Sequence, residues 1–235
     1  MTDIKDLSKN ALIVGASGGI GSAIADELHQ RSDYKNVIRE SRSQTNFDIT
    51  DENQVAARAE QICGTLNGQK LDLVIVATGI LAPKKHGPEK SFAAISPDII
   101  AETFAVNAFG PALVIKHFKS LLATNRRCVF AALSARVGSI GDNRLGGWMS
   151  YRSSKAALNQ IIRCASVEFG RSHKESIVVA LHPGTVETML TRDHAKGRFT
   201  ARADEAAQQM LSVLDNLTTK DTGGFFAYDG SEIDW

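Results

Sequence analysis

The chain has 235 residues, of which 43% are hydrophobic and 23% are charged. This composition supplies enough apolar surface for a buried core and excludes general disorder. Lysine and arginine number 27 against 26 aspartates and glutamates, a formal net charge of +1, so a nucleic-acid partner is not expected. The three cysteines are widely spaced without a CxxC motif, and the six histidines show no ligand spacing. Neither a disulfide framework nor a metal site is therefore expected.

Short apolar runs alternate with amphipathic segments along the whole chain. The strand candidates are residues 11–14, 36–41, 45–48, 71–76, 128–133, 177–181 and 223–228. The helix candidates are a segment with Ile20, Ile24 and Leu28 at four-residue spacing, one that starts near Asp51, and residues 97–123, 150–169 and 206–217. This order predicts an α/β fold of the Rossmann type, a doubly wound, mostly parallel sheet of seven strands with helices on both faces.

The chain shows no Pro/Gly/Ser-rich linker and no internal repeat, so we expect residues 1–235 to form a single domain. Its first residues are polar, and its longest apolar stretch, near residues 71–81, is shorter than the ~20 residues that span a bilayer. We therefore expect no signal sequence, no membrane partner and a cytoplasmic location.

The first strand candidate is followed by a glycine-rich turn, Gly15-x3-Gly19-x-Gly21, and then by a helix. In an open α/β sheet, ligands bind beyond the carboxyl ends of the strands, where a helix N-terminus presents free N–H groups to an anion. The turn therefore predicts a site for a dinucleotide pyrophosphate. A plain strand–turn–helix connection is the alternative.

The same turn also matches the G-x-S-x-G nucleophile elbow of α/β-hydrolases, with Ser17 as the nucleophile. Its position argues against that interpretation, because the elbow follows several strands and needs an oxyanion-hole loop upstream. Only 14 residues precede Gly15. A phosphate-binding P-loop is excluded because no Gly-Lys-Ser/Thr follows.

A second motif, Tyr151-Arg-Ser-Ser-Lys155, places a phenol and an ammonium four residues apart. On a helix the two side chains share a face. We expect the ammonium to lower the pKa of Tyr151, which would make the phenol a usable proton donor or acceptor at neutral pH.

Taken together, these motifs resemble those of the short-chain dehydrogenase/reductase family, over essentially the whole chain. The matching pieces, in the family's order, are the glycine turn, Asp48, Asn107, Ser134, Tyr151-x3-Lys155 and Pro183-Gly-Thr-Val-Glu-Thr188. Within the family, the stretches that begin at Ser134 and at Tyr151 resemble the bacterial C-factor (C-signal) subgroup.

The resemblance implies hydride transfer between a nicotinamide cofactor and a carbonyl/alcohol substrate. Tyr151 would be the general acid/base, and Lys155 would hold the nicotinamide ribose. Ser134 would orient the substrate oxygen, although it lies 17 residues before Tyr151, more than the usual gap, and Ser139 is a rival. Asn107 would hold a water that links Lys155 to solvent. Since Pro111 lacks an N–H, the Asn107 carbonyl loses its helical partner and could bind that water. A Gly-Pro kink that serves packing alone is the alternative.

The resemblance also implies a set of cofactor-binding residues. They are Gly15, Ser17, Gly18, Gly19, Ile20, Gly21, Ser41, Arg42, Asp48, Ile49, Ala77, Thr78, Gly79, Tyr151, Lys155, Pro183, Gly184, Val186 and Thr188. Asp48 would meet the adenine edge, or else cap the helix near Asp51. After the strand candidate 71–76, the family often has two asparagines, but this chain has Val76-Ala-Thr-Gly79. This departure puts the bracing of the sheet in doubt.

The residues after the second strand bear on the choice between NADP(H) and NAD(H). Ser41 and Arg42 suit the 2′-phosphate of NADP, because a guanidinium pairs well with phosphate. We therefore expect NADP(H), with NAD(H) as the alternative: if the strand ends one residue earlier, Glu40 becomes the acid that binds the ribose 2′-OH.

The remaining expectations concern partners. Segments 82–96, 135–149 and 187–200 should surround a small-molecule substrate, and a homodimer or homotetramer should form through the helix after Tyr151 and the long helix before it. A second hypothesis is a dinucleotide-binding signalling or regulatory protein of the C-factor type with little turnover.

Overall fold

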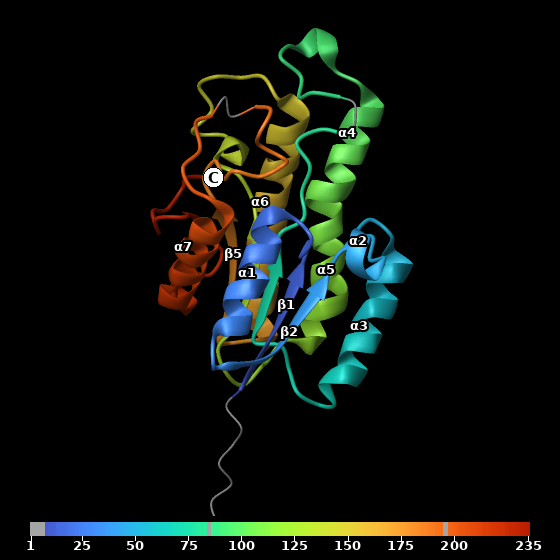
Figure 1. Cartoon of the computed structure of the whole chain (residues 1–235), viewed down its shortest axis with the longest axis vertical. Helices are drawn as coiled ribbons and strands as arrows, with labels where there is room; N and C mark the ends of the chain where they lie inside the picture. The colour runs from blue at the N-terminus through green and yellow to red at the C-terminus, as the bar shows by residue number, and fades with distance from the viewer. Residues whose placement is uncertain (1–7, 84–85, 195–196) are drawn as a thin grey trace, which may run out of the picture.

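The computed structural model describes residues 8–83, 86–194 and 197–235, and these residues form one parallel sheet between two helical layers (Figure 1). The strands are β1 (Lys9–Val14), β2 (Tyr34–Glu40), β3 (Leu73–Val76), β4 (Cys128–Leu133), β5 (Ser176–His182) and β6 (Phe225–Ala227). They lie in the order β2-β1-β3-β4-β5-β6, and each neighbouring pair is parallel. The predicted Rossmann-type fold is confirmed.

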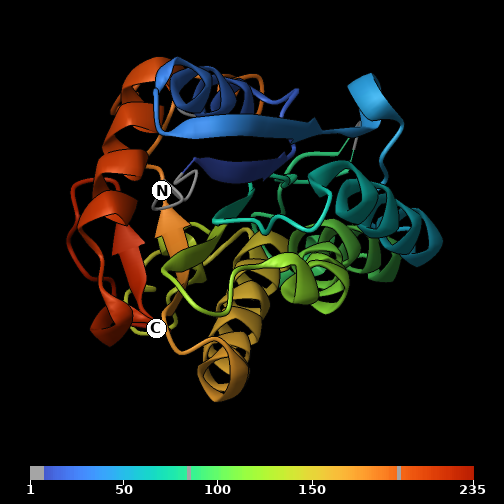
Figure 2. The same cartoon turned by 90° about the horizontal axis from the view of Figure 1, so that it is seen from below.

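Alternate side chains of the strands feed two separate cores, as expected for a sheet covered on both faces. One core packs the sheet against α3 (Glu52–Leu66), α5 (Gly110–Phe118) and α6 (Met149–Ser172). The other packs it against α1 (Gly19–Gln30) and α7 (Ala203–Asn216). Figure 2 shows these two layers on opposite sides of the strands. The carboxyl ends of the strands therefore open onto one edge of the molecule.

The prediction of a seventh strand at residues 45–48 is wrong, since the sheet has six strands within the described ranges. Ser41 instead caps a short helix, α2 (Arg42–Thr45), and Asn46 then takes a left-handed conformation with φ 54°. Phe47 and Ile49 are buried, so their alternation reflects packing of a loop against the core and not pairing in a sheet.

The predicted helix 97–123 is divided into several parts. It comprises α4 (Pro97–Phe104), a π-helical turn η2 (Ala105–Phe109), α5 and a 3₁₀ turn η3 (Lys119–Leu121). By length and composition alone, the stretch Pro97–Leu121 could cross a membrane, a property that the argument from residues 71–81 overlooked. Packing explains part of its hydropathy, because Val114 and Phe118 are fully buried in the core on one face of the sheet, while 39% of the apolar window as a whole is buried.

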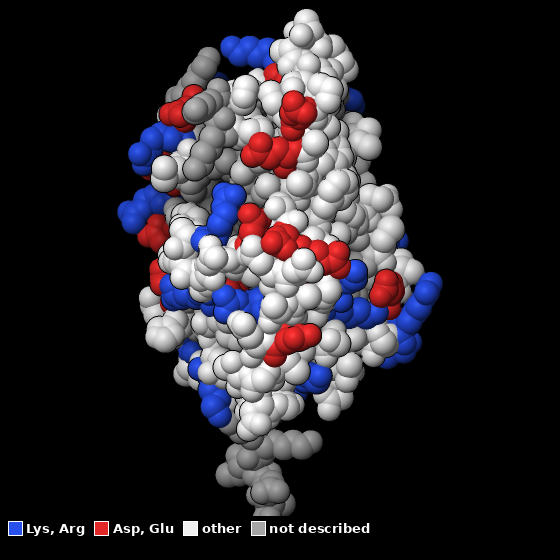
Figure 3. Space-filling model, turned by 90° about the vertical axis from the view of Figure 1, so that its right-hand side faces the viewer, with Lys and Arg blue, Asp and Glu red and all other residues white. Residues whose placement is uncertain are grey.

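Three short 3₁₀ turns complete the described elements: η1 (Phe92–Ala94), η4 (Arg136–Gly138) and η5 (Thr219–Asp221). Basic and acidic side chains are interspersed over the face shown in Figure 3, in keeping with the net charge of +1. Parts of two predicted substrate segments, residues 84–85 and 195–196, lie outside the described residues.

Candidate active site

The glycine turn between β1 and α1 is shaped by close backbone contacts. Gly15 has φ 89°, and a Cβ placed on it would lie 2.8 Å from both the backbone nitrogen and the hydroxyl of Thr78. A Cβ on Gly21 would collide with the carbonyl of Gly15. Gly18 precedes α1 without any side-chain cap, so the first N–H groups of the helix remain available to an anion. This cradle fits the pyrophosphate of a dinucleotide.

A cleft extends from this turn across the ends of β1, β2 and β3. Ten of the predicted cofactor-binding residues line it: Gly15, Ser17, Gly18, Ser41, Arg42, Asp48, Ile49, Ala77, Thr78 and Gly79. Sequence reasoning missed five further lining residues: Val14, Ser43, Phe47, Ile80 and Val106. Phe47 adjoins the predicted cofactor-binding residues Asp48 and Ile49, and this adjacency was the signal that could have identified it.

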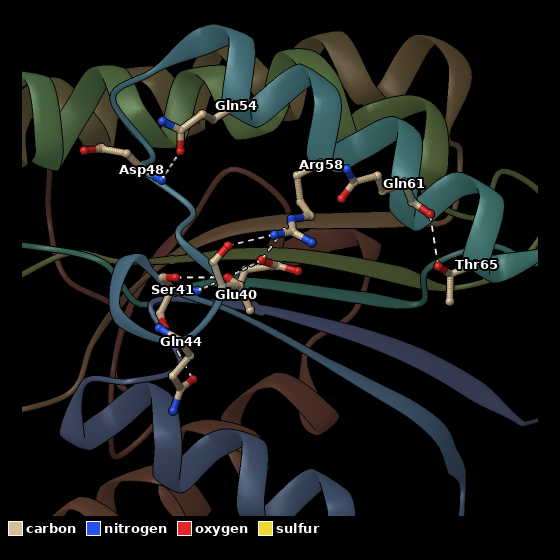
Figure 4. A network of polar contacts seen from close by, with 9 residues as sticks. Glu40, Ser41, Gln44, Asp48, Gln54, Arg58, Gln61 and Thr65 are labelled. Atoms are coloured by element: carbon tan, nitrogen blue, oxygen red, sulfur yellow. Dashed lines mark hydrogen bonds and ion pairs between the residues drawn. The ribbon is translucent and has the colours of Figure 1, made fainter.

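Strand β2 ends at Glu40, but the carboxylate of this residue does not line the cleft. The hydroxyl of Thr45 donates to Glu40 Oε2 at 2.6 Å, and Arg58 Nε of α3 lies 3.3 Å from the same oxygen (Figure 4). Burial raises the pKa of Glu40, while these two partners oppose that rise. The acid is therefore held by α3, and the next residues along, Ser41, Arg42 and Ser43, face the cleft.

Asp48 lies at the cleft, where Figure 4 shows its backbone N–H donating to Gln54 Oε1 at 3.0 Å. Its carboxylate accepts from the backbone and hydroxyl of Thr50, which lower the pKa of Asp48. The cap of α3 is Asp51, whose side chain accepts from two backbone N–H groups. Asp48 is thus not the helix cap that the sequence left open as an alternative.

Tyr151 and Lys155 lie on one face of α6, as the spacing predicts, with the Lys155 ammonium 5.9 Å from the centre of the Tyr151 ring. Lys155 is only 3% exposed and donates to the carbonyl of Leu133, at the end of β4, at 2.7 Å. A Cβ on Gly79 would lie 3.4 Å from the Lys155 nitrogen. The ammonium is therefore fixed beside the ends of β3 and β4, next to the cleft.

The expectation that Lys155 lowers the pKa of Tyr151 is wrong for this structure. Burial raises the pKa of Tyr151 to about 12 and lowers the pKa of Lys155 to about 8. Desolvation disfavours the charged form of each group, and burial is the cause of both shifts. Tyr151 consequently holds its proton at neutral pH, the state required of a proton donor.

Asn107 is fully buried in the π-helical turn η2 and fixes the backbone beyond β3. Its Oδ1 accepts from the N–H of Ile80, and its Nδ2 donates to the Ile80 carbonyl, both at 2.8 Å. Nδ2 also donates to the hydroxyl of Ser154 on α6 at 3.0 Å. The bracing that the missing asparagines after Val76 left in doubt is supplied by this amide.

The two candidate serines are both buried and both engaged. The Ser134 hydroxyl donates to Asn159 Oδ1 at 2.6 Å, and the Ser139 hydroxyl accepts from the N–H of Asp142 at 3.1 Å. Neither forms a hydrogen bond to Tyr151 among the described residues. The Ser139 hydroxyl still carries a donatable proton, whereas that of Ser134 is directed at Asn159 of α6.

The Pro183–Thr188 segment lies against the glycine turn, as a cofactor-covering loop would. A Cβ on Gly19 would lie 3.0 Å from Thr188 Cγ2. Val186 is buried and forms a parallel bridge with Ala201. Gly184 has φ 81°.

The described residues contain no cluster of three or more His, Cys, Asp or Glu that could hold a metal ion.

Comparison with known proteins identifies the family. The model of the short chain dehydrogenase family matches residues 9–198. The chain belongs to the short-chain dehydrogenase/reductase family. A relative with near-complete coverage is 1-hydroxy-2-glutathionyl-2-methyl-3-butene dehydrogenase of Rhodococcus sp. (strain AD45), 31% identical over 238 residues, which cover 95% of this chain and 98% of that protein. C-signal of Myxococcus xanthus is 35% identical over 136 residues, 58% of this chain and 78% of that protein.

Solved structures agree with this assignment. The carbonyl reductase Sniffer of D. melanogaster has a TM-score of 0.85 at 23% identity, and covers 97% of this chain and 100% of its own. An NADPH-bound carbonyl reductase from chicken fatty liver has a TM-score of 0.81 at 25% identity, with 97% of this chain and 99% of its own covered. This short-chain dehydrogenase/reductase is thus an oxidoreductase of carbonyl and alcohol groups, as predicted.

Sequence reasoning missed several residues of this dehydrogenase/reductase beside the predicted set. Asn159 binds Ser134, and Arg58 and Thr45 hold Glu40. Asn159 and Arg58 carry no local motif, because each acts on a residue distant in sequence, whereas Thr45 lies five residues after Glu40 in a segment that was predicted to be a strand. His182, at the end of β5, has a buried Nδ1 without a hydrogen-bond partner among the described residues, and burial lowers the pKa of His182 to about 4.

Proposed function

We propose that this enzyme transfers a hydride between NADP(H) and a carbonyl/alcohol substrate, with Tyr151 as the general acid/base. The observation that carries the proposal is the continuity of the site. The cleft is lined by Arg42, by the glycine turn and by Gly79, on which a Cβ would lie 3.4 Å from the Lys155 ammonium. A dinucleotide laid along it would bring its nicotinamide to the Tyr151–Lys155 pair.

The cofactor, when bound, supplies or accepts the hydride. The chain then has to position the substrate and manage one proton. In the direction of reduction, Tyr151 donates its proton to the developing alkoxide, and its high pKa keeps it protonated beforehand. Lys155, held by the Leu133 carbonyl, would bind the nicotinamide ribose and offset charge on the phenolate left behind.

We retain Ser134 as the hydroxyl that orients the substrate oxygen, with Ser139 as its rival. Separate alanine variants decide between them. The serine that contacts the reacting oxygen should lose turnover much more than substrate binding. For Ser134 the contact requires its hydroxyl to leave Asn159, so Asn159→Ala should leave activity in place if Ser134 acts.

The preference for NADP(H) rests on the turn after β2. The carboxylate of Glu40, the residue that would favour NAD(H), is bound by Thr45 and Arg58. The exposed Arg42 lines the cleft, where it helps to lower the pKa of Asp48. A guanidinium there would pair with the 2′-phosphate. The NADPH bound in the chicken carbonyl reductase supports the same choice.

We further propose that residues 1–235 act as one dinucleotide-binding domain in the cytoplasm, as a homodimer or homotetramer. Segments 82–96, 135–149 and 187–200 would surround the substrate. The signalling hypothesis is not favoured. The C-signal similarity covers 58% of the chain, whereas similarity to a dehydrogenase covers 95%.

A panel of carbonyl compounds tests the proposal, with NADPH and NADH compared by the loss of their absorbance. We expect turnover with NADPH that Tyr151→Phe reduces by at least about a hundredfold, since a positioned proton donor contributes roughly 10²–10⁴. Unchanged turnover in Tyr151→Phe would disprove the role of the tyrosine. Equal efficiency with both cofactors would disprove the NADP(H) preference.

A further inference from the structure

The turn that leads into α6 has an unusual backbone. Gly146, Gly147 and Trp148 follow one another with φ of 60°, 66° and 52°. Glycine adopts this left-handed region readily, but a bulky residue such as tryptophan rarely does. Non-glycine residues in such conformations cluster at active sites and ligand clamps, where the surrounding structure enforces them. Trp148 lies three residues before Tyr151.

Glu89 is the residue that enforces this turn. It is 5% exposed, and its backbone carbonyl accepts from the N–H of Trp148 at 2.5 Å. Its carboxylate accepts from the backbone N–H of Ser150 at 3.3 Å and from the Ser150 hydroxyl. A carboxylate at the first turn of α6 is also favoured by the helix dipole. Glu89 thus fixes both the backbone and the start of the helix.

The turn that Glu89 holds places the Trp148 ring between Tyr151 and His194. The ring meets Tyr151 edge to face, with centroids 6.4 Å apart and planes at 66°. On another side it meets His194 at 5.9 Å and 73°. His194 belongs to the segment after Thr188, where Met189 and Leu190 are also exposed, at 92% and 40%. The proton donor Tyr151 therefore contacts the Trp148 ring, and the same ring contacts a segment that carries exposed apolar side chains.

We infer that Trp148 is a specificity-determining residue, which contacts the group attached to the substrate carbonyl and favours flat aromatic groups over small aliphatic ones. Glu89 is the positioning residue that holds the ring in place. Aromatic pairs of this geometry gain from the ring quadrupole beyond their buried area, and a small aliphatic group cannot reproduce that contact. The inference rests on the proposed carbonyl reduction at Tyr151.

The test compares kcat/KM for benzaldehyde and propanal in the NADPH-dependent reaction. Trp148→Ala should lower the benzaldehyde value by about 10-fold or more, the range typical of one pocket contact, and the propanal value by less than about 3-fold. Trp148→Phe should retain most of the benzaldehyde preference. Trp235→Ala is the matched control, since it removes the same kind of side chain, which stacks on Phe225 outside the three proposed substrate segments, and it should leave both values unchanged.

Glu89→Ala should shift the benzaldehyde/propanal ratio in the direction of Trp148→Ala, with an unchanged KM for NADPH, and Glu89→Gln should restore part of it. A Glu89 that only supported folding would lower the melting temperature and leave the ratio unchanged. Equal losses for both aldehydes in folded, NADPH-binding Trp148→Ala and Trp148→Phe would overturn the inference. Absence of turnover in the wild-type enzyme with every carbonyl would instead refute the proposed function.

Discussion

Replacing Arg42 by alanine should remove the preference for NADPH while sparing NADH. Arg42 is exposed at the cleft. The Asp48 carboxylate, whose pKa it helps to lower, is only half-buried and keeps its Thr50 partners, so the loss of Arg42 leaves no unpaired buried charge behind. A hydrogen bond to a charged group contributes about 1.5–3 kcal/mol. Solvent around an exposed guanidinium favours the lower end, and about 1.5 kcal/mol corresponds to roughly a tenfold rise in the Kd of NADPH.

The assay is a titration of each cofactor, followed by fluorescence, at two salt concentrations. The wild-type Kd for NADPH should rise with salt more steeply than that of Arg42→Ala, because a Debye length of about 30 Å at 0.01 M shrinks to about 8 Å at 0.15 M. Arg39→Ala is the control: it removes the same charge, but Arg39 is paired with Asp26 at 2.8 Å. Equal weakening of NADPH and NADH binding by Arg42→Ala, or the same effect from Arg39→Ala, would refute the assignment.

Three further outcomes follow from the geometry. Gly15→Ala should destabilise the fold by about 2–4 kcal/mol in denaturant unfolding, since φ 89° and the contact with Thr78 leave no room for a Cβ. Gly64→Ala is the control: a Cβ at this position of helix α3 would have no neighbour within 4 Å, so the substitution should stabilise the fold by about 0.5–1 kcal/mol. For carbonyl reduction, kcat/KM should fall as the pH rises through about 8, because Lys155 is charged only below its lowered pKa; a profile that is flat to pH 10 would contradict this role. Arg58→Met should cost about 1–3 kcal/mol, because it leaves the buried Glu40 carboxylate without its ion pair. The loss should be smaller at mildly acidic pH, since burial already raises the pKa of Glu40 and protonation relieves the unpaired charge; a loss that grows as the pH falls would exclude this account.

The parts of the fold that sequence predicts are those with local causes. The doubly apolar runs at 128–133 and 177–181 became β4 and β5 almost residue for residue. The four-residue spacing of Ile20 and Ile24 became α1. In each of these segments, the spacing of the apolar residues alone indicates whether one face or both faces are buried. The glycine turn is predictable for the same reason, since its strain is local.

Errors arose where a pattern had a cause elsewhere in the chain. The alternation at residues 45–48 comes from Phe47 packing into the core, not from pairing. Glu40 could not be placed from sequence, because its partner Arg58 lies on α3, 18 residues on. The pKa of Tyr151 follows from burial by the whole fold, which spacing to Lys155 does not report.

Asn107 shows how a residue inferred from resemblance gains a physical role from its contacts. Both Nδ2 hydrogens are used by the Ile80 carbonyl and Ser154, and Oδ1 accepts from the Ile80 N–H, so the side chain has no N–H left to donate to a relay water. The main-chain carbonyl of Asn107 lacks the usual helical donor, because Pro111, four residues later, has no N–H. Asn107 also lies at the centre of the π-helical turn Ala105–Phe109. We therefore propose that Asn107 braces the strand end through its side chain and offers its main-chain carbonyl to the relay water beside Lys155.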